Sequence, residues 1–106
     1  MAMEQYIYTL KLVPRLLDEQ NWNEGENQII KEHFNKLKAL MEENTVILAG
    51  KTQTNDESTF GIVILQAESE QEAKKLMEND PAVKEGIMTA QIYPYRIALF
   101  NNRFNG

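Results

Sequence analysis

The chain of 106 residues contains no cysteine, one histidine, one tryptophan, three prolines and five glycines. Without cysteine it forms no disulfide, no thiolate metal site and no thiol nucleophile, which excludes thiol proteases and thiol redox enzymes. It also lacks an apolar run long enough to cross a bilayer, and its first residues do not form a basic and then apolar leader. We therefore expect a cytoplasmic protein without membrane contact.

Basic residues are scarce as well, because 11 Lys and Arg face 16 Asp and Glu and leave a formal net charge of -5. Binding to a phosphate backbone requires clustered Lys and Arg, so we expect no nucleic-acid partner. The dispersed glycines form no G-x-G-x-x-G loop, and one histidine among scattered carboxylates lacks a metal-ligand spacing. The sequence therefore predicts neither a nucleotide cofactor nor a metal.

Apolar patterning predicts four strands. The first, Gln5–Val13, alternates with the period of two that is typical of a strand. Strands at Val46–Gly50 and Phe60–Leu65 form a hairpin around a polar turn. The last strand, Ile87–Ala98, is interrupted or lies at a sheet edge at Pro94, since proline donates no hydrogen bond to a neighbouring strand.

Two helices are predicted between these strands. In Glu24–Glu43, apolar residues recur at spacings of four, three and four, which indicates an amphipathic helix whose packed face carries or borders His33. The second helix, within Ser69–Asn79, starts with a capping box formed by Ser69 and the glutamate three residues later. Pro81–Glu85 adds one helical turn. The apolar stripe of the first helix consists of Ile30, Phe34, Leu37 and Met41, and it is widened by Ile29, His33 and Leu40.

The order strand, helix, strand, strand, helix, strand over residues 1–106 predicts a single α+β domain, a ferredoxin-like βαββαβ sandwich with both helices on one face of the sheet. The strand sequence Ile62-Val63-Ile64-Leu65 is apolar on both faces, so the face away from the helices needs cover too. A second copy of the sheet is the simplest cover, and we predict a homodimer through the sheet faces. Hairpin edges left partly exposed on a monomer are the alternative.

Four pieces of the sequence share a pattern with a known family. They are His33 with Leu37 and Leu40, Ile47-Leu48-Ala49-Gly50, Glu70 to Ala73, and Asp80-Pro81-Ala82-Val83 followed by Gly86, of which the last is the most specific. Together they resemble the YCII-related (YciI-like) family of small dimeric α+β barrel proteins. The resemblance implies that His33 and Asp80 line a pocket. Its clearest enzymatic analogy is to dehydrochlorinase and muconolactone-isomerase-like proteins on related barrels.

His33 and Asp80 are therefore the predicted catalytic residues. Imidazole titrates near neutral pH and is the natural general base there, although a lone histidine on an apolar face is otherwise a packing residue. The Asp80 carboxylate is placed to cap the turn that begins at Pro81. If it also approaches His33, it holds one imidazole tautomer and stabilises the imidazolium that forms when the base takes a proton.

Two further residues are predicted to contact a substrate. Trp22, in the polar segment before the first helix, either closes over an apolar or aromatic ligand or anchors its own loop. Lys51 stands where the family usually has proline, and we expect it to narrow or charge the mouth of the pocket. The sequence leaves open whether Lys51, Arg15 or Arg96 supplies a contact to an anion.

These residues favour an acid–base enzyme of lyase or isomerase type that acts on a small anionic or aromatic metabolite in a pocket between the first helix and the sheet. The alternative is a dimeric module that binds a metabolite, or regulates, without turnover. A cofactor-free monooxygenase, in which the substrate itself activates O₂, is a third hypothesis.

Overall fold

A computed structural model describes residues 3–104, so residues 1–2 and 105–106 of the predicted domain lie outside the described residues. Four strands form one antiparallel sheet in the order β2-β3-β1-β4. They are β1 (Glu4–Leu12), β2 (Val46–Lys51), β3 (Gly61–Ala67) and β4 (Met88–Tyr95).

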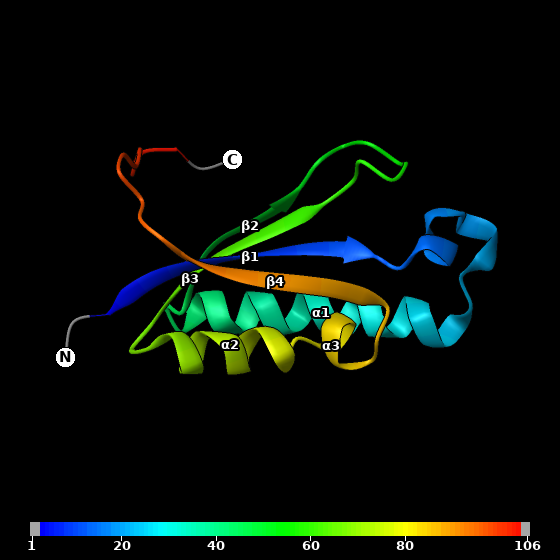
Figure 1. Ribbon diagram of the computed structural model, residues 1–106, viewed down its shortest axis with the longest axis horizontal. Helices are drawn as coiled ribbons and strands as arrows, with labels where there is room; N and C mark the ends of the chain where they lie inside the picture. Colours follow the sequence, from blue (N-terminus) through cyan, green and yellow to red (C-terminus); the bar gives the residue numbers. More distant parts are fainter. Residues whose placement is uncertain (1–2, 105–106) are drawn as a thin grey trace.

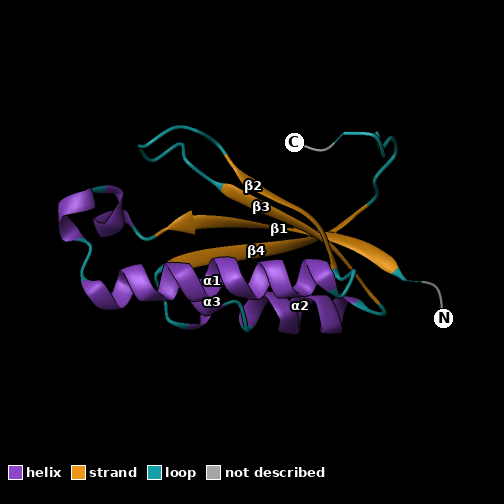
Figure 2. Cartoon of the chain, turned by 180° about the vertical axis from the view of Figure 1, so that it is seen from behind, coloured by secondary structure: helices purple, strands orange, loops and turns teal. Residues whose placement is uncertain are grey.

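Three α-helices lie together on one face of this sheet (Figures 1 and 2). They are α1 (Glu24–Glu42), α2 (Glu70–Glu78) and α3 (Pro81–Lys84). In the chain α1 joins β1 to β2, and α2 with α3 joins β3 to β4. This order, together with the order of strands in the sheet, confirms the predicted ferredoxin-like βαββαβ architecture.

The core lies between the helices and the sheet face that they cover. Tyr6, Tyr8 and Leu10 alternate along β1 and are buried, as the period of two predicted. Tyr8 stands opposite Val63 of β3 and Ile92 of β4, so three neighbouring strands meet at the centre of the core. From the helices, the buried contributors to this core are Leu37, Leu40, Ala73 and Met77.

The packed face of α1 is narrower than the predicted stripe. Leu37 is buried, but Phe34 and Met41, which are seven residues apart and share one side of the helix, are exposed. Their predicted burial is wrong because α1 packs against β2 and α3, which cover only part of its wide apolar surface. Leu40, which was predicted to widen the stripe, is buried, and so is Glu26 in the first turn of the helix.

The ends of the helices follow local hydrogen bonding. The Ser69 hydroxyl accepts a hydrogen bond from the Glu72 amide at 3.2 Å, which is one half of the predicted capping box. A complete box occurs at the start of α1, where it was not predicted, between Asn23 and Glu26. Asn44 follows α1 with φ of 65°, the left-handed conformation that commonly ends a helix.

The last strand is shorter than predicted. β4 ends at Tyr95, whose partner Gln5 lies next to the first residue of β1. The residues up to Ala98, which were predicted to belong to the strand, lie outside it because β1 offers little further backbone to pair with. Pro94 lies inside β4, which is an edge strand of the sheet, as a proline in a strand requires.

Candidate functional site

Asp80 lies at the N-terminal end of α3 and is only 2% exposed. Its Oδ1 atom accepts a hydrogen bond from the Ala82 amide at 3.0 Å, the capping role that its position before Pro81 predicted. The same oxygen lies 2.6 Å from Nδ1 of His33, and Oδ2 accepts a hydrogen bond from the Tyr8 hydroxyl at 2.9 Å. One buried carboxylate thus joins α3, α1 and β1.

The His33 side chain, from the middle of α1, is 14% exposed. A carboxylate only accepts hydrogen bonds, so contact with Asp80 places the proton of the neutral imidazole on Nδ1. Nε2 is then the nitrogen with a free lone pair. The structure therefore brings the two predicted catalytic side chains together and gives the histidine the tautomer that a general base needs.

Tyr8 is the third member of this cluster, and the sequence does not predict it as a site residue. The alternating pattern of β1 predicts only that Tyr8 lies on one face of the strand, as a residue of the core or of an interface, and names no partner for its hydroxyl. Burial raises the pKa of its hydroxyl far above the ordinary value, and the charge of Asp80 and the hydrogen bond to it raise it further. Tyr8 therefore stays protonated and donates to Asp80. The available signal was that a buried tyrosine hydroxyl needs a partner.

A cavity of about 400 Å³ opens beside His33. Residues of all four strands and of α1 line it, and most of them are apolar, among them Leu10 and Leu37. Besides His33, the polar side chains in the lining are those of Lys51 and Thr59. An apolar hollow with a few polar groups is the usual form of a small-molecule site, and it lies between α1 and the sheet as expected.

A second hollow of about 480 Å³ shares Leu12, Ile30, Lys51 and Thr59 with the first, so the two adjoin. Lys51, which was predicted to narrow or charge the mouth of the pocket, lines both hollows. Trp22 lines only the second hollow and is not among the residues around the cavity beside His33. The structure thus brings both predicted substrate contacts to the second hollow, but only Lys51 to the cavity beside His33.

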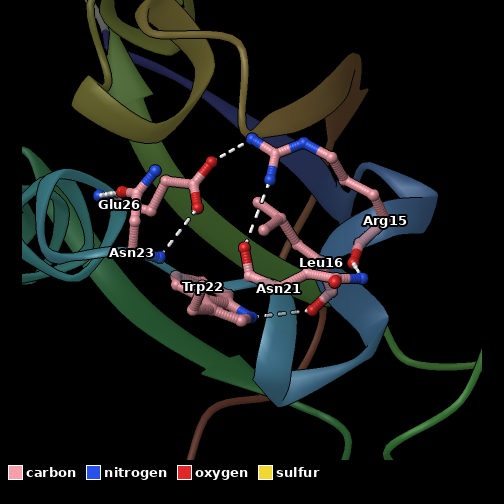
Figure 3. A network of polar contacts seen from close by, with 6 residues as sticks. All are labelled: Arg15, Leu16, Asn21, Trp22, Asn23 and Glu26. Atoms are coloured by element: carbon pink, nitrogen blue, oxygen red, sulfur yellow. Dashed lines mark hydrogen bonds and ion pairs between the residues drawn. The ribbon is translucent and has the colours of Figure 1, made fainter.

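The segment that carries Trp22 is held firmly, as Figure 3 shows. It consists of two short 3-10 helices, η1 (Pro14–Leu17) and η2 (Glu19–Asn21). The Trp22 indole donates a hydrogen bond from Nε1 to the Leu16 carbonyl at 2.8 Å, while the Leu16 side chain is itself buried. These contacts correspond to the anchoring role that was one of the two predictions for Trp22.

An ion pair between Arg15 and Glu26 connects the segment of the two 3-10 helices to α1. The guanidinium of Arg15 donates to Oε2 of Glu26, and Oε1 of Glu26 accepts from the Asn23 amide at 3.1 Å (Figure 3). The hydrogen bond from Arg15 lowers the pKa of Glu26 most, against the opposing effect of burial. Arg15, one of the candidate anion contacts, is therefore paired within the chain, and neither hollow is lined by Arg96.

Within residues 3–104 no three His, Asp or Glu side chains gather closely enough to hold a metal ion. The helices of this same part of the chain are all too short or too polar to cross a membrane. The cluster itself brings together an imidazole, a carboxylate in contact with it, and a tyrosine hydroxyl that donates a hydrogen bond to the carboxylate.

The fold is shared with solved structures, among them the following two. One is 5-chloro-2-hydroxyhydroquinone dehydrochlorinase (TftG) from Burkholderia phenoliruptrix, in complex with 2,5-dihydroxybenzoquinone. Its sequence is 20% identical to this one, and the two structures superpose with a TM-score of 0.65. The match covers 87% of this chain and 93% of the TftG chain. The other is an uncharacterized protein from Thermotoga maritima, which is 11% identical, with a TM-score of 0.57 over 90% of this chain and 100% of that one.

Comparison of the sequence with curated proteins and with family models gives a different result for each. No curated protein matches the chain. A family model, that of the YCII-related domain, matches residues 6–96 and so includes His33, Lys51 and Asp80. The chain belongs to the YCII-related family.

Proposed function

We propose that this protein is an acid–base enzyme of lyase or isomerase type, with His33 as the general base and Asp80 as the residue that orients it. The observation that carries the proposal is the 2.6 Å contact between His33 Nδ1 and Asp80 Oδ1 at the wall of an apolar cavity. A histidine that served packing alone would not need a buried carboxylate fixed by two further hydrogen bonds.

In the proposed reaction Nε2 of His33 removes a proton from a carbon or hydroxyl group of a molecule bound in the cavity. The imidazolium that results is stabilised by the negative charge of Asp80. The electron pair left on the substrate then either expels a leaving group, which is an elimination, or shifts within the molecule, which then takes the proton back from His33 at a new position. The apolar walls exclude water and so strengthen these electrostatic interactions.

The lining of the cavity supports a substrate with one flat apolar part and one polar or anionic group. Apolar side chains form most of the walls, while Lys51 and Thr59 supply polar contacts where the two hollows join. TftG is a dehydrochlorinase whose structure holds a dihydroxybenzoquinone. Ring compounds with acidic hydroxyl groups are therefore reasonable first compounds to test against this chain.

The test is a panel of chlorinated hydroquinones, lactones and small keto acids, followed by thermal shift and by product analysis. We expect at least one compound to be both bound and converted, and His33→Ala to abolish conversion. Asn35→Ala is the control, because Asn35 is an exposed residue of the same helix. Binding without conversion would support the metabolite-binding module instead, and turnover unaffected by His33→Ala would refute the role of His33.

We also propose that the working form is a homodimer in the cytoplasm, paired through the sheet faces that the helices leave open. On that face Ile7 of β1 stands opposite Ile64 of β3 and Tyr93 of β4. Leu48, Tyr93 and Tyr95 are exposed on the same face, and so much exposed apolar surface is uncommon on a monomer. Sedimentation at micromolar concentration tests the pairing, and a species of 12.3 kDa would contradict it.

A further inference from the structure

The residues after β4, 96–104, form a tail whose large apolar side chains are exposed to solvent. Leu99, Phe100 and Phe104 are 94%, 64% and 77% exposed. Figure 1 shows that this tail leaves the sheet on the side opposite the helices. Its backbone is fixed near its start, where the Ile97 amide donates to the Gln5 side chain at 2.7 Å. The tail is therefore directed away from the core of its own chain.

Leaving these side chains in water is unfavourable. Burying one leucine or phenylalanine is worth roughly a tenfold change or more in an association constant. Three of them within six residues, on a segment that makes no strand or helix, indicate a surface that another molecule covers.

The open face of the sheet lies on the same side as the tail. Leu48, Tyr93 and Tyr95 are exposed there, around the less exposed Ile7, Ile62 and Ile64. By the alternation of the strands, the residues on this face include Lys11 but no Asp or Glu. The tail and the face thus both expose apolar side chains on the side of the sheet away from the helices.

The distribution of charge indicates which molecule covers this surface. The chain carries 16 acidic residues, and every one of them precedes Ile87. The tail instead bears Arg96 and Arg103. Each copy is acidic overall, so two copies repel one another least where they meet through surfaces that lack acidic groups, and neither the open face nor the tail carries an Asp or Glu.

We propose that residues 96–104 form an arm that packs on a second copy of this chain, with Leu99 and Phe100 as its anchors. In a two-fold dimer each copy extends its arm to the other, so every contact is made twice. The inference rests on the sheet-face dimer proposed above and adds to it a segment that crosses between the copies.

Crosslinking tests the arm directly, because the chain has no cysteine and a single introduced thiol is unique. A benzophenone is attached to Leu99→Cys in unlabelled protein, which is refolded together with ¹⁵N-labelled wild type and irradiated. We expect crosslinked peptides that join a light chain to a heavy chain. The same probe on Phe34→Cys, on the helix side, is the control and is expected to give none.

A dimer that yields only crosslinks within one chain would overturn the arm and leave the sheet-face dimer intact, because the tail would then fold back on its own sheet. A dimer with no crosslink at all would overturn the arm as well. A monomer by sedimentation would overturn both. These outcomes separate the arm from the dimer on which it rests.

Matched substitutions give a second, quantitative test. Phe100 and Phe34 are the same residue type and are 64% and 65% exposed. We expect Phe100→Ser to raise the Kd of the dimer by about tenfold or more, and Phe34→Ser to leave it within about threefold of wild type. A Kd for Phe100→Ser equal to that of wild type would refute the arm.

Discussion

Nδ1 of His33 lies 2.6 Å from Oδ1 of Asp80, although 47 positions separate the two residues in the chain. Asp80 is the N-cap of α3 and is also the residue that contacts His33 of α1. The contact with His33 therefore depends on where α3 begins. Asp80 therefore has a structural and a proposed catalytic role at once, and substitutions must be chosen to separate them.

Asp80→Asn is the substitution that separates them. Asparagine caps a helix as well as aspartate does, but it has no negative charge to stabilise the imidazolium and does not enforce the tautomer of His33. We expect kcat on any substrate found by the panel to fall by roughly 10²- to 10⁴-fold, while the melting temperature falls less than in Asp80→Ala. Unchanged kcat in a folded Asp80→Asn protein would contradict the proposed dyad.

Tyr8→Phe tests the support that the carboxylate receives from β1. The change removes only the hydroxyl that donates to Asp80 Oδ2 and leaves a buried acceptor without this partner. We expect the free energy of unfolding in urea to decrease by about 1 to 3 kcal/mol. Tyr93→Phe removes an exposed hydroxyl bonded to Gln91 and is the control, with a change below about 0.5 kcal/mol. Equal effects of the two changes would argue against a special role for Tyr8.

The ion pair between Arg15 and Glu26 predicts a pH dependence of stability. Because the pKa of Glu26 is lower in the folded chain than its ordinary value of 4.5, the stabilisation is present above that value and is lost as the pH falls through the folded pKa. We expect Arg15→Ala to show a smaller loss of stability than wild type between neutral pH and acid. Urea unfolding measured across this range checks it, and parallel curves for the two proteins would contradict the assignment.

Lys51→Gln tests the contact to a polar or anionic group of the substrate. Lys51 lines both hollows but is not part of the His33 cluster. We expect its loss to raise KM by roughly tenfold for an anionic compound, the effect of one charge-assisted hydrogen bond, with kcat little changed. A neutral analogue of the same compound is the control and should bind equally well to both proteins.

The sequence by itself determined the elements and their order. The alternation around Tyr6 and Tyr8 located β1, and the proline after Asp80 located the start of α3, because both signals act over a few residues and depend on backbone geometry. The family pattern around His33 and Asp80 singled out both residues of the candidate dyad. Their catalytic role stays a prediction.

Only the tertiary structure decided which side chains meet. The partnership of Tyr8 with Asp80 spans 72 positions, and the exposure of Phe34 depends on how far β2 and α3 extend over α1. Local propensity carries no information on such distances. Contacts of this kind arise when the helices pack on the sheet, because close packing sets the relative positions of all the elements together.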